Sequence, residues 1–469
     1  MAEEFKKKKD EIYKLVLEFE AKTKNDIDIY YDSESYEKII KWYIDNHKFK
    51  IGLKAVNFAL SQHQFSSDLL IQKANILIAL QKFSDSLQCL ERAHSLNPTD
   101  ENIFILIGQV KIILGEYSEA VTTLQDALKY SDNKDEVNYQ IGLAYQAQKD
   151  FSNASSFFKN AIEININHEN ALYDLAYCLE QTGELKNSTH YYKKFIDEDP
   201  YSEYAWFNLG NIYFKLREYE KAIESFEYAI AIDEDYSTAY TNLGESNLKL
   251  KRYESSKKYF LKSLELDGPS PEIYCAIGRA YYFLEDYSTS ISYFQKSIKI
   301  DQFFKESFFW LGKSLVSLDK WFEAIHYFKK AHKFDLENIE YIKSLAFAEF
   351  KVGNLVTSIE LYDKALEIDP SDHKISLEYS SMYYESGDID KAICIIEDAI
   401  DESPGESILY YRLVIYLMDA GKYKESINVL ESALSLNFDN HEVLFDFIPN
   451  FETQSALIRV INQYRKKNN

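Results

Sequence analysis

The sequence has few of the residues from which many functional sites are built. Of its 469 residues, 14 are glycine, 7 are proline and 4 are cysteine. The cysteines form no CxxC pair and the nine histidines form no HExxH motif, so the sequence carries no signature of a metal site. Their spacing of roughly a hundred residues also argues against a disulfide framework and predicts reduced thiols. The cysteines are Cys89, Cys178, Cys275 and Cys394.

Glycine-rich phosphate loops are missing as well. No GxxxxGK[ST] or GxGxxG motif occurs, which removes the usual sequence signals for nucleotide and dinucleotide cofactors. Acidic pairs such as Asp233 and Asp235 fall between predicted helices, where carboxylates ordinarily cap the next helix. We therefore expect no catalytic residues, no cofactor, no metal and no enzymatic activity.

The chain lacks an excess of positive charge and long apolar runs. Its formal net charge is −23, which argues against nucleic-acid binding and against an anionic membrane surface. A protein partner that is basic or of mixed charge would suit this charge, although a solvated acidic face is the more frequent explanation. No run reaches the ~18 apolar residues of a membrane span, and the N-terminus lacks a signal peptide. We expect a soluble cytoplasmic protein without direct membrane insertion.

What the chain does contain is a repeated helical pattern, seen most clearly in residues 203–236. Trp206, Leu209, Gly210 and Tyr213 are spaced i, i+3, i+4, i+7, which places them on one face of a first helix, helix A. A second helix, helix B, follows with Tyr219, Ala222, Phe226 and Ala229 at threes and fours. Small residues let the two backbones approach, and large residues fill the space beside them.

This pattern recurs every 34 residues. The position of Ala222 is small at every step, and the position of Phe226 is always large and apolar. The register runs from Ser33 to Asn440 without insertion or deletion and predicts twelve copies. They begin at residues 33, 67, 101, 135, 169, 203, 237, 271, 305, 339, 373 and 407.

The pattern W-x2-L-G-x2-Y followed by A-x3-F resembles the tetratricopeptide repeat. The resemblance covers most of the chain and implies an all-α, right-handed α-solenoid, a superhelix of stacked helix-turn-helix repeats. Residues 33–440 would be the twelve repeats, residues 1–32 an N-terminal capping helix with its lead-in, and residues 441–469 an atypical C-terminal repeat with capping helices. The Tyr-, Lys-, Asn- and Ile-rich composition also resembles that of long cytoplasmic repeat proteins of Bacteroidota.

The two terminal segments depart from the repeat. Ile12, Leu15, Val16 and Phe19 form an apolar stripe, which predicts one helix that covers the first repeat. The C-terminal segment begins like a thirteenth repeat but has Pro449 inside the expected helix A. We expect a C-terminal cap there. The alternative is a docking element for a partner or for a second copy of the chain.

In tetratricopeptide-repeat proteins helix A lines the concave surface, so the resemblance also implies where a partner would bind. The positions of Phe207, Asn211 and Phe214 should face that groove. Aromatic rings beside amides suit an extended or helical peptide, because asparagine side chains can form hydrogen bonds with the peptide backbone. The alternative is that these rings pack against neighbouring helices. The predicted partner-binding residues are Tyr139, Tyr173, Tyr177, Phe207, Asn208, Asn211, Phe214, Asn242, Arg279, Tyr282 and Phe309.

Two family subtypes can be compared with these positions. Chaperone-tail clamps use two asparagines, matched here by Asn211 and Asn242, and three basic residues. Phe207, Glu272 and Ala276 occupy the basic positions, so a terminal carboxylate would meet repulsion. An asparagine ladder like that of the glycosyltransferase-linked repeats is only partial. Asn208 and Asn242 match it, whereas Ala276 and Trp310 do not.

Together these features predict a non-catalytic scaffold or adaptor that binds one or more proteins or peptides in a concave groove. The alternative is a peptide-responsive regulator, similar to a co-chaperone, whose superhelix changes pitch on binding. A change in compaction in X-ray scattering when the partner is added would favour the regulator.

Overall fold

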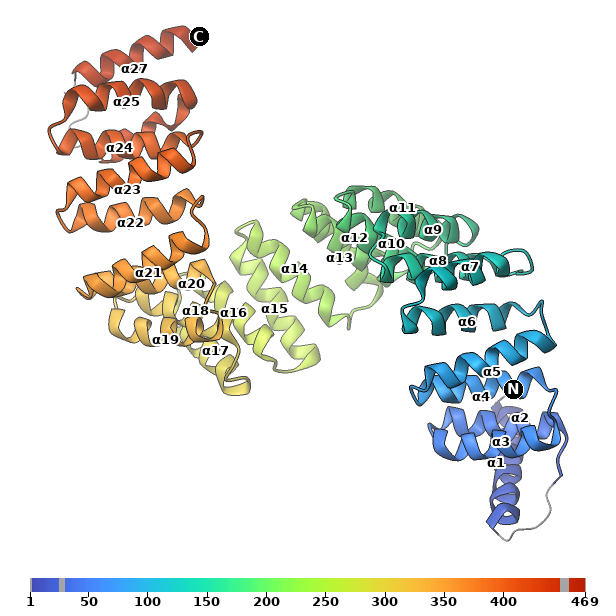
Figure 1. The fold of residues 1–469 in the computed structure, drawn as a ribbon. Coiled ribbons are helices and arrows are strands. Elements are labelled where there is room, and N and C mark those ends of the chain that lie inside the picture. Colours follow the sequence, from blue (N-terminus) through green and yellow to red (C-terminus); the bar gives the residue numbers. More distant parts are fainter. Residues whose placement is uncertain (1, 25–29, 448–454, 469) are drawn as a thin grey trace. The chain divides into compact units, whose positions relative to one another are not determined.

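The computed structural model describes residues 2–24, 30–447 and 455–468 of the chain (Figure 1). The described part is all helical and contains no strand. It forms two compact units, residues 1–234 and residues 235–469. In each unit consecutive helices stack as pairs, which confirms the predicted α-solenoid class. Pro449 and residues 25–29 lie outside the described residues.

The first unit holds one long N-terminal helix and six helix pairs. A short 3-10 helix, η1, precedes the second helix of the fifth pair. The helices are α1 (Ala2–Lys24); α2 (Ser33–Asp45) and α3 (Phe49–Gln62); α4 (Ser67–Ala79) and α5 (Phe83–Leu96); α6 (Glu101–Leu114) and α7 (Tyr117–Ala127); α8 (Lys134–Ala147) and α9 (Phe151–Ile164); α10 (Glu169–Gln181), η1 (Leu185–Asn187) and α11 (Ser188–Glu198); α12 (Glu203–Lys215) and α13 (Tyr219–Ile232).

The second unit likewise holds six helix pairs, followed by shorter C-terminal elements. They are α14 (Ser237–Lys249) and α15 (Tyr253–Asp267); α16 (Pro271–Phe283) and α17 (Tyr287–Ile300); α18 (Lys305–Val316) and α19 (Trp321–Phe334); α20 (Ile339–Lys351) and α21 (Leu355–Ile368); α22 (His373–Glu385) and α23 (Ile389–Glu402); α24 (Ser407–Asp419) and α25 (Tyr423–Leu436); η2 (Asp439–Glu442), α26 (Val443–Phe447) and α27 (Ser455–Asn468).

Local sequence determines where the helices start and stop. The Ser202 hydroxyl accepts a hydrogen bond from the Ala205 N–H (3.2 Å) and caps α12, and Ser270 caps α16 ahead of Pro271 in the same way. Each turn between paired helices contains one residue with positive φ. Five of these residues are glycine, and seven carry a side chain: His47, Gln81, Lys149, Arg217, Lys251, Glu285 and Asp319.

One helix start differs from the expected pattern. The other second helices begin at the position of Tyr219, but at this position in the fifth pair, Leu185, the chain forms the 3-10 helix η1. The Ser188 hydroxyl donates to the Leu185 carbonyl (2.6 Å), three residues earlier. This bond occupies a carbonyl in the first turn and favours the tighter i→i+3 arrangement.

Both ends of the described chain cover apolar surface. Val16 and Phe19 of α1 are buried against Tyr36 and Ile39 of α2. The Tyr43 hydroxyl also donates to Glu20 of α1 (3.0 Å). At the other end, buried apolar residues of α27 join the core that includes Leu430 and Leu434 of α25; they are Leu457, Val460 and Ile461. Division of the chain into a lead-in, twelve repeats and a C-terminal segment stays a prediction.

None of the helices in the described part of the chain combines the length and the apolar character that a membrane crossing requires. The four cysteines are free thiols. Cys178 and Cys275 are buried, Cys89 is half-buried and Cys394 is exposed. Within the described residues, no group of three or more His, Cys, Asp or Glu side chains could hold a metal ion.

Candidate functional site

The best-formed site among the predicted residues is a pocket in the first unit, between α10, η1, α11 and α12. Its volume is about 210 Å³. Five of the predicted partner-binding residues line it, and we call it the Tyr173 pocket. The lining residues are Tyr173, Ala176, Tyr177, Glu180, Leu185, Tyr192, Asn208, Asn211, Ile212, Phe214 and Lys215.

Two tyrosines form the exposed wall of the Tyr173 pocket. Tyr173 and Tyr177 lie one turn apart on α10, and their side chains are 56% and 43% exposed. The Tyr177 ring meets Phe151 edge-on, with ring centroids 5.9 Å apart, which fixes its orientation. These rings therefore offer apolar faces and hydroxyl groups to a ligand without being part of the core.

The opposite wall comes from α12. Asn208 is buried and donates from Nδ2 to the Tyr204 carbonyl (2.9 Å), while Asn211 is half-buried and one turn further along. The Phe214 ring packs edge-on against Tyr219 at 5.4 Å. At the rim, the Lys215 ammonium lies 2.5 Å from the Glu180 carboxylate and joins the two walls. The pocket thus combines aromatic faces, amides and one internally paired charge.

Two tyrosines in and beside the pocket, Tyr192 and Tyr204, have raised pKa values because they are buried. The pKa of the Tyr204 hydroxyl rises to about 12. A neutral hydroxyl can both donate and accept a hydrogen bond. The Tyr173 pocket therefore has the chemistry of a hydrogen-bonding and stacking site.

Two predicted residues of the first unit do not line the Tyr173 pocket. The Tyr139 hydroxyl donates to Asp174 (3.0 Å), and its ring lies 4.7 Å from that of His168. Phe207 is half-buried, and its ring centroid lies 5.7 Å from that of Phe226 in the core. Packing against neighbours, the alternative that the sequence left open, describes both residues.

The predicted residues of the second unit lie on successive first helices. Asn242 on α14 and Tyr282 on α16 are half-buried. Arg279 donates from both Nη atoms to Glu245 (3.0 and 3.2 Å) and lies over the Trp310 ring at 5.8 Å. Because its Nη groups are already engaged, Arg279 offers little charge to a partner.

Phe309 was predicted to contact a partner, but its side chain is buried. It is 6% exposed, and its ring packs within 6 Å of the rings of Phe328 and Tyr341. Large neighbours on both sides enclose the ring. It therefore belongs to the core of the second unit and contributes little surface.

A second pocket of about 170 Å³ lies on the first helices of three later pairs, α20, α22 and α24. Phe347, Phe350, Leu377 and Ser381 line it together with Arg412. These residues are not among the predicted partner-binding residues, which come from earlier repeats. Phe347 stands five 34-residue steps from Tyr177, and Leu377 stands five steps from Phe207, so the same register would have found them.

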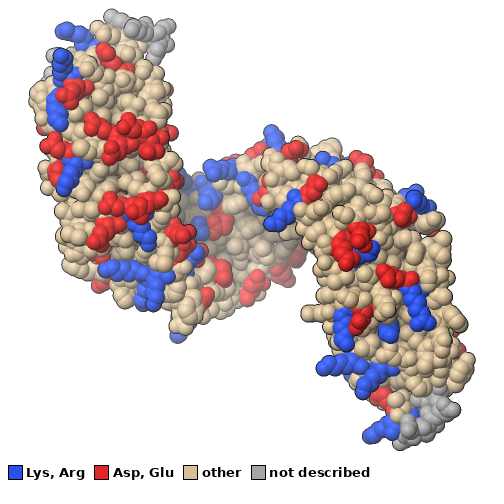
Figure 2. Space-filling model, viewed as in Figure 1, with Lys and Arg blue, Asp and Glu red and all other residues tan. Residues whose placement is uncertain are grey.

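The described surface carries no large basic patch on the face seen in Figure 2, where Lys and Arg are scattered among Asp and Glu in each unit. Many of these charges are paired on the surface, as Lys351 is with Glu385 (2.6 Å). Such exposed pairs contribute little to stability.

Comparison with known families matches tetratricopeptide-repeat models to several segments. One model matches residues 203–236, a second matches residues 235–302, and a third matches residues 135–168, 169–202 and 408–440. No curated protein matches the sequence.

Solved structures with a similar arrangement include three repeat proteins. YrrB, described as a TPR protein with an unusual peptide-binding site, is 22% identical, with a TM-score of 0.33, 40% of this chain covered and 97% of its own. Yeast Tom70 is 16% identical, with a TM-score of 0.44 and coverage of 87% and 98%. Cut9, from the APC/C hetero-tetramer Cut9–Hcn1, is 11% identical, with a TM-score of 0.41 and coverage of 92% and 96%.

Proposed function

We propose that the chain is a tetratricopeptide-repeat protein and that it is a non-catalytic scaffold or adaptor that binds a protein or peptide segment along its first helices. The observation that carries this proposal is the Tyr173 pocket, where Tyr173, Tyr177, Asn208, Asn211 and Phe214 line one cavity. Exposed aromatic rings beside amides are suited to a peptide, since rings bind apolar side chains and amides pair with its backbone.

The size of the Tyr173 pocket favours a side chain over a free small molecule. Small-molecule sites usually enclose about 300–1,000 Å³. The pocket has about 210 Å³ and is open to solvent along the exposed Tyr173 ring. A single large side chain of a peptide would fill it, while the rest of the peptide continued over neighbouring first helices.

The partner that we propose is basic or of mixed charge, in keeping with the net charge of −23. Nucleic acid does not fit this charge. We further propose that the protein works in the cytoplasm and that the C-terminal segment is a point at which a second copy could dock. The similarity of composition to repeat proteins of Bacteroidota also stays a prediction.

The experiment is capture of partners from the source cytosol, with Tyr173→Ala/Tyr177→Ala alongside the wild type. Both tyrosines are exposed, so their removal should leave the circular dichroism spectrum unchanged. The matched control is Tyr130→Ala/Tyr201→Ala, which removes two exposed tyrosines of the same unit that lie outside the pocket.

We expect a partner that the control variant retains and the Tyr173/Tyr177 variant loses by at least tenfold. Equal capture by all three proteins would contradict the proposed site. X-ray scattering with and without the captured partner then separates a rigid scaffold from a regulator that changes compaction.

A further inference from the structure

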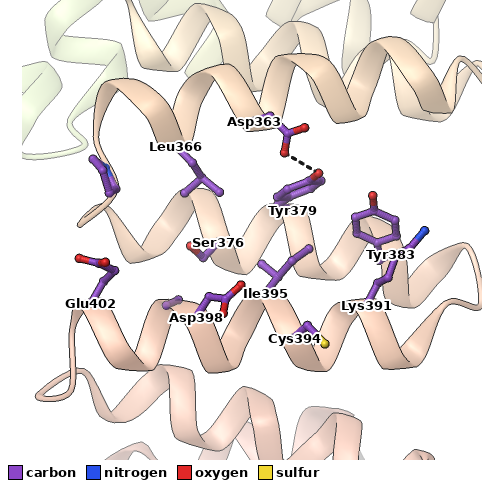
Figure 3. Close-up of a pocket in the computed structure, with 12 residues that line it drawn as sticks. Asp363, Leu366, Ser376, Tyr379, Tyr383, Lys391, Cys394, Ile395, Asp398 and Glu402 are labelled. Carbon is purple, nitrogen blue, oxygen red and sulfur yellow. Dashed lines mark hydrogen bonds between the residues drawn. The ribbon is translucent and has the colours of Figure 1, made fainter.

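A larger cavity, of about 350 Å³, lies in the second unit between α21, α22 and α23 (Figure 3). We call it the Ser376 pocket. Three residues of α22 face it at helical spacing: Ser376, Tyr379 and Tyr383. Leu377 and Ser381 of the same helix line the pocket of about 170 Å³ that contains Phe347 instead. The Ser376 pocket is therefore separate from the surface on which the proposed function rests.

The cavity coincides with one exceptional residue in the repeat. At the position of Ser376, the other eleven copies carry asparagine or a larger apolar or aromatic residue, such as Trp206 or Tyr274. In α12 this side chain fills space, because the Trp206 ring stacks on Tyr228 with centroids 4.3 Å apart. Serine leaves that space open, with the side chains of Leu366, Ile395 and Ala399 around it.

The rim of the Ser376 pocket carries two carboxylates, Asp398 and Glu402, and no other copy has a carboxylate at both positions, since Asp126 and Glu198 occur in separate copies. Asp398 stands where five earlier copies have lysine, and Glu402 stands where most copies have an apolar residue. The lysines are Lys194, Lys262, Lys296, Lys330 and Lys364. The copy with the small serine is thus the one copy that carries a carboxylate at both positions.

These carboxylates stand where helix electrostatics disfavour them. Asp398 and Glu402 are four residues apart on α23, so their like charges repel, and both lie in its last turns, at the negative end of the helix dipole. Neither has an ion-pair partner among the described residues. Lys391, the one cation of the lining, lies 3.1 Å from Asp388 and is already paired. A cationic ligand would relieve this repulsion.

The interior of the Ser376 pocket also offers unused hydrogen-bonding capacity. Ser376 is 3% exposed and faces the cavity, and its hydroxyl has no hydrogen-bond partner within the described residues. Nearby, the Tyr379 hydroxyl donates to Asp363 (2.8 Å), which orients that third carboxylate at the rim. The Ser376 hydroxyl is therefore free to form a hydrogen bond with a group that enters the cavity.

We propose that the Ser376 pocket binds an arginine side chain from a basic segment of a protein partner. The apolar floor suits the stem of the side chain, and the carboxylates of Asp398 and Glu402 suit its charge. The guanidinium carries five N–H donors in a planar fork, which matches acceptors spread over two helices better than the compact ammonium of lysine.

The test is fluorescence anisotropy of a fluorescein-labelled, N-acetylated peptide with one arginine between two leucines. The comparison peptide contains citrulline, which keeps the shape and removes the charge. Three variants of the full chain are compared. Ser376→Tyr introduces a large aromatic residue, as in several other copies. Asp398→Lys introduces the lysine that five other copies have at this position. Glu397→Lys makes the same charge change at a neighbouring residue outside the pocket.

We expect the arginine peptide to bind at least tenfold more tightly than the citrulline peptide. Ser376→Tyr and Asp398→Lys should each weaken binding by tenfold or more, whereas Glu397→Lys should change it less than threefold. The arginine peptide should also slow the reaction of the exposed Cys394 thiol, which lines the pocket, with Ellman's reagent.

Equal binding of both peptides would overturn the proposal. An equal loss of binding in Asp398→Lys and Glu397→Lys would also overturn it, because binding would then come from diffuse charge attraction. If Ser376→Tyr fails to fold, as judged by circular dichroism, the exposed variant Asp398→Lys/Glu402→Ile decides. Retained binding in that variant would refute the site. These outcomes do not depend on the Tyr173 pocket.

Discussion

A Cβ atom added to Gly210 would lie 2.6 Å from Cε1 of the Phe226 ring, a separation that packed atoms do not tolerate. The same relationship recurs at Gly142, Gly244, Gly278 and Gly312, each facing a phenylalanine sixteen residues later. At two other steps a large first residue is accompanied by an aliphatic second one, Ile40 with Val56 and Val414 with Leu430, whereas Ala176 and Ala346 face tyrosines. In the five glycine–phenylalanine pairs, the phenylalanine ring therefore occupies the space that a Cβ atom on the first helix would need.

We therefore predict that Gly210→Ala destabilises the first unit. Alanine within a helix usually gains about 0.5–1 kcal/mol over glycine, but the overpacking against Phe226 should cost about 1–3 kcal/mol. Native-state hydrogen exchange of the α12 and α13 amides measures the difference. Gly210→Ala/Phe226→Leu should recover most of the loss, and a single variant more stable than the wild type would show that the ring moves away at little cost.

The turns between paired helices give a stabilising prediction. Lys149 has φ of 63°, in the left-handed region, where the same turn of the next pair has Gly183 with φ of 77°. Lys149→Gly should raise the local free energy of unfolding by roughly 0.5–1 kcal/mol, because the Cβ strain is removed. Hydrogen exchange in α8 and α9 checks this. Gly183→Ala is the reciprocal control and should destabilise, although an added Cβ there meets no atom within 4 Å.

The pair formed by Arg279 and Glu245 links two successive helix pairs of the second unit. Both Nη atoms of Arg279 donate to Glu245, and the guanidinium lies over Trp310. Arg279→Lys keeps the charge but loses the two-point contact and the stacking, so we expect a loss of about 1 kcal/mol. A double-mutant cycle with Glu245→Gln measures the coupling by urea unfolding. A coupling near zero would mean that the pair is a solvated surface contact.

His332 and Lys364 give a pH-dependent prediction. Burial, followed by the nearby Lys364 ammonium, lowers the pKa of His332 below its usual value of 6.5. The Lys364 ammonium lies 3.3 Å from Nε2, so a protonated imidazole would meet a like charge. The unfolded chain therefore takes up this proton at a higher pH than the folded chain does, and stability falls as the pH drops below about 6.5.

His332→Gln should remove this part of the acid sensitivity, measured as the change in hydrogen exchange of the α19 and α21 amides between pH 7.5 and pH 5.5 after correction for intrinsic exchange rates. Lys364→Met should reduce the sensitivity without abolishing it, because burial is the larger cause. An unchanged pH dependence in His332→Gln would assign the effect to other groups.

Much of the helical arrangement could be predicted from the sequence, because each helix pair is specified by residues close to each other in the chain. The spacing of Trp206, Leu209 and Tyr213 defines one helix face, and the small residues Gly210 and Ala222 define the close approach of its partner. These are local, periodic signals. They predicted the fold class and the register in which the aromatic and amide positions of the Tyr173 pocket were found.

The exposure of each side chain could not be predicted in the same way. Tyr173 and Phe309 occupy the same repeat position, yet the first is 56% exposed and the second is 6% exposed. The difference comes from the neighbours, since Phe328 and Tyr341 enclose Phe309. The size of a side chain in the next repeat determines whether a ring is exposed or buried, and the periodic pattern of the sequence does not predict this.

The sequence by itself determined a helical solenoid with small and large residues in register, because short-range spacing fixes which faces of adjacent helices meet. Only the tertiary structure decided which positions became cavities. Ser376 reads as one more small residue in the chain, and it lines a cavity only because α21 and α23 leave space above it. Packing is a property of several helices together, and a pocket is the place where their side chains fail to fill the shared volume.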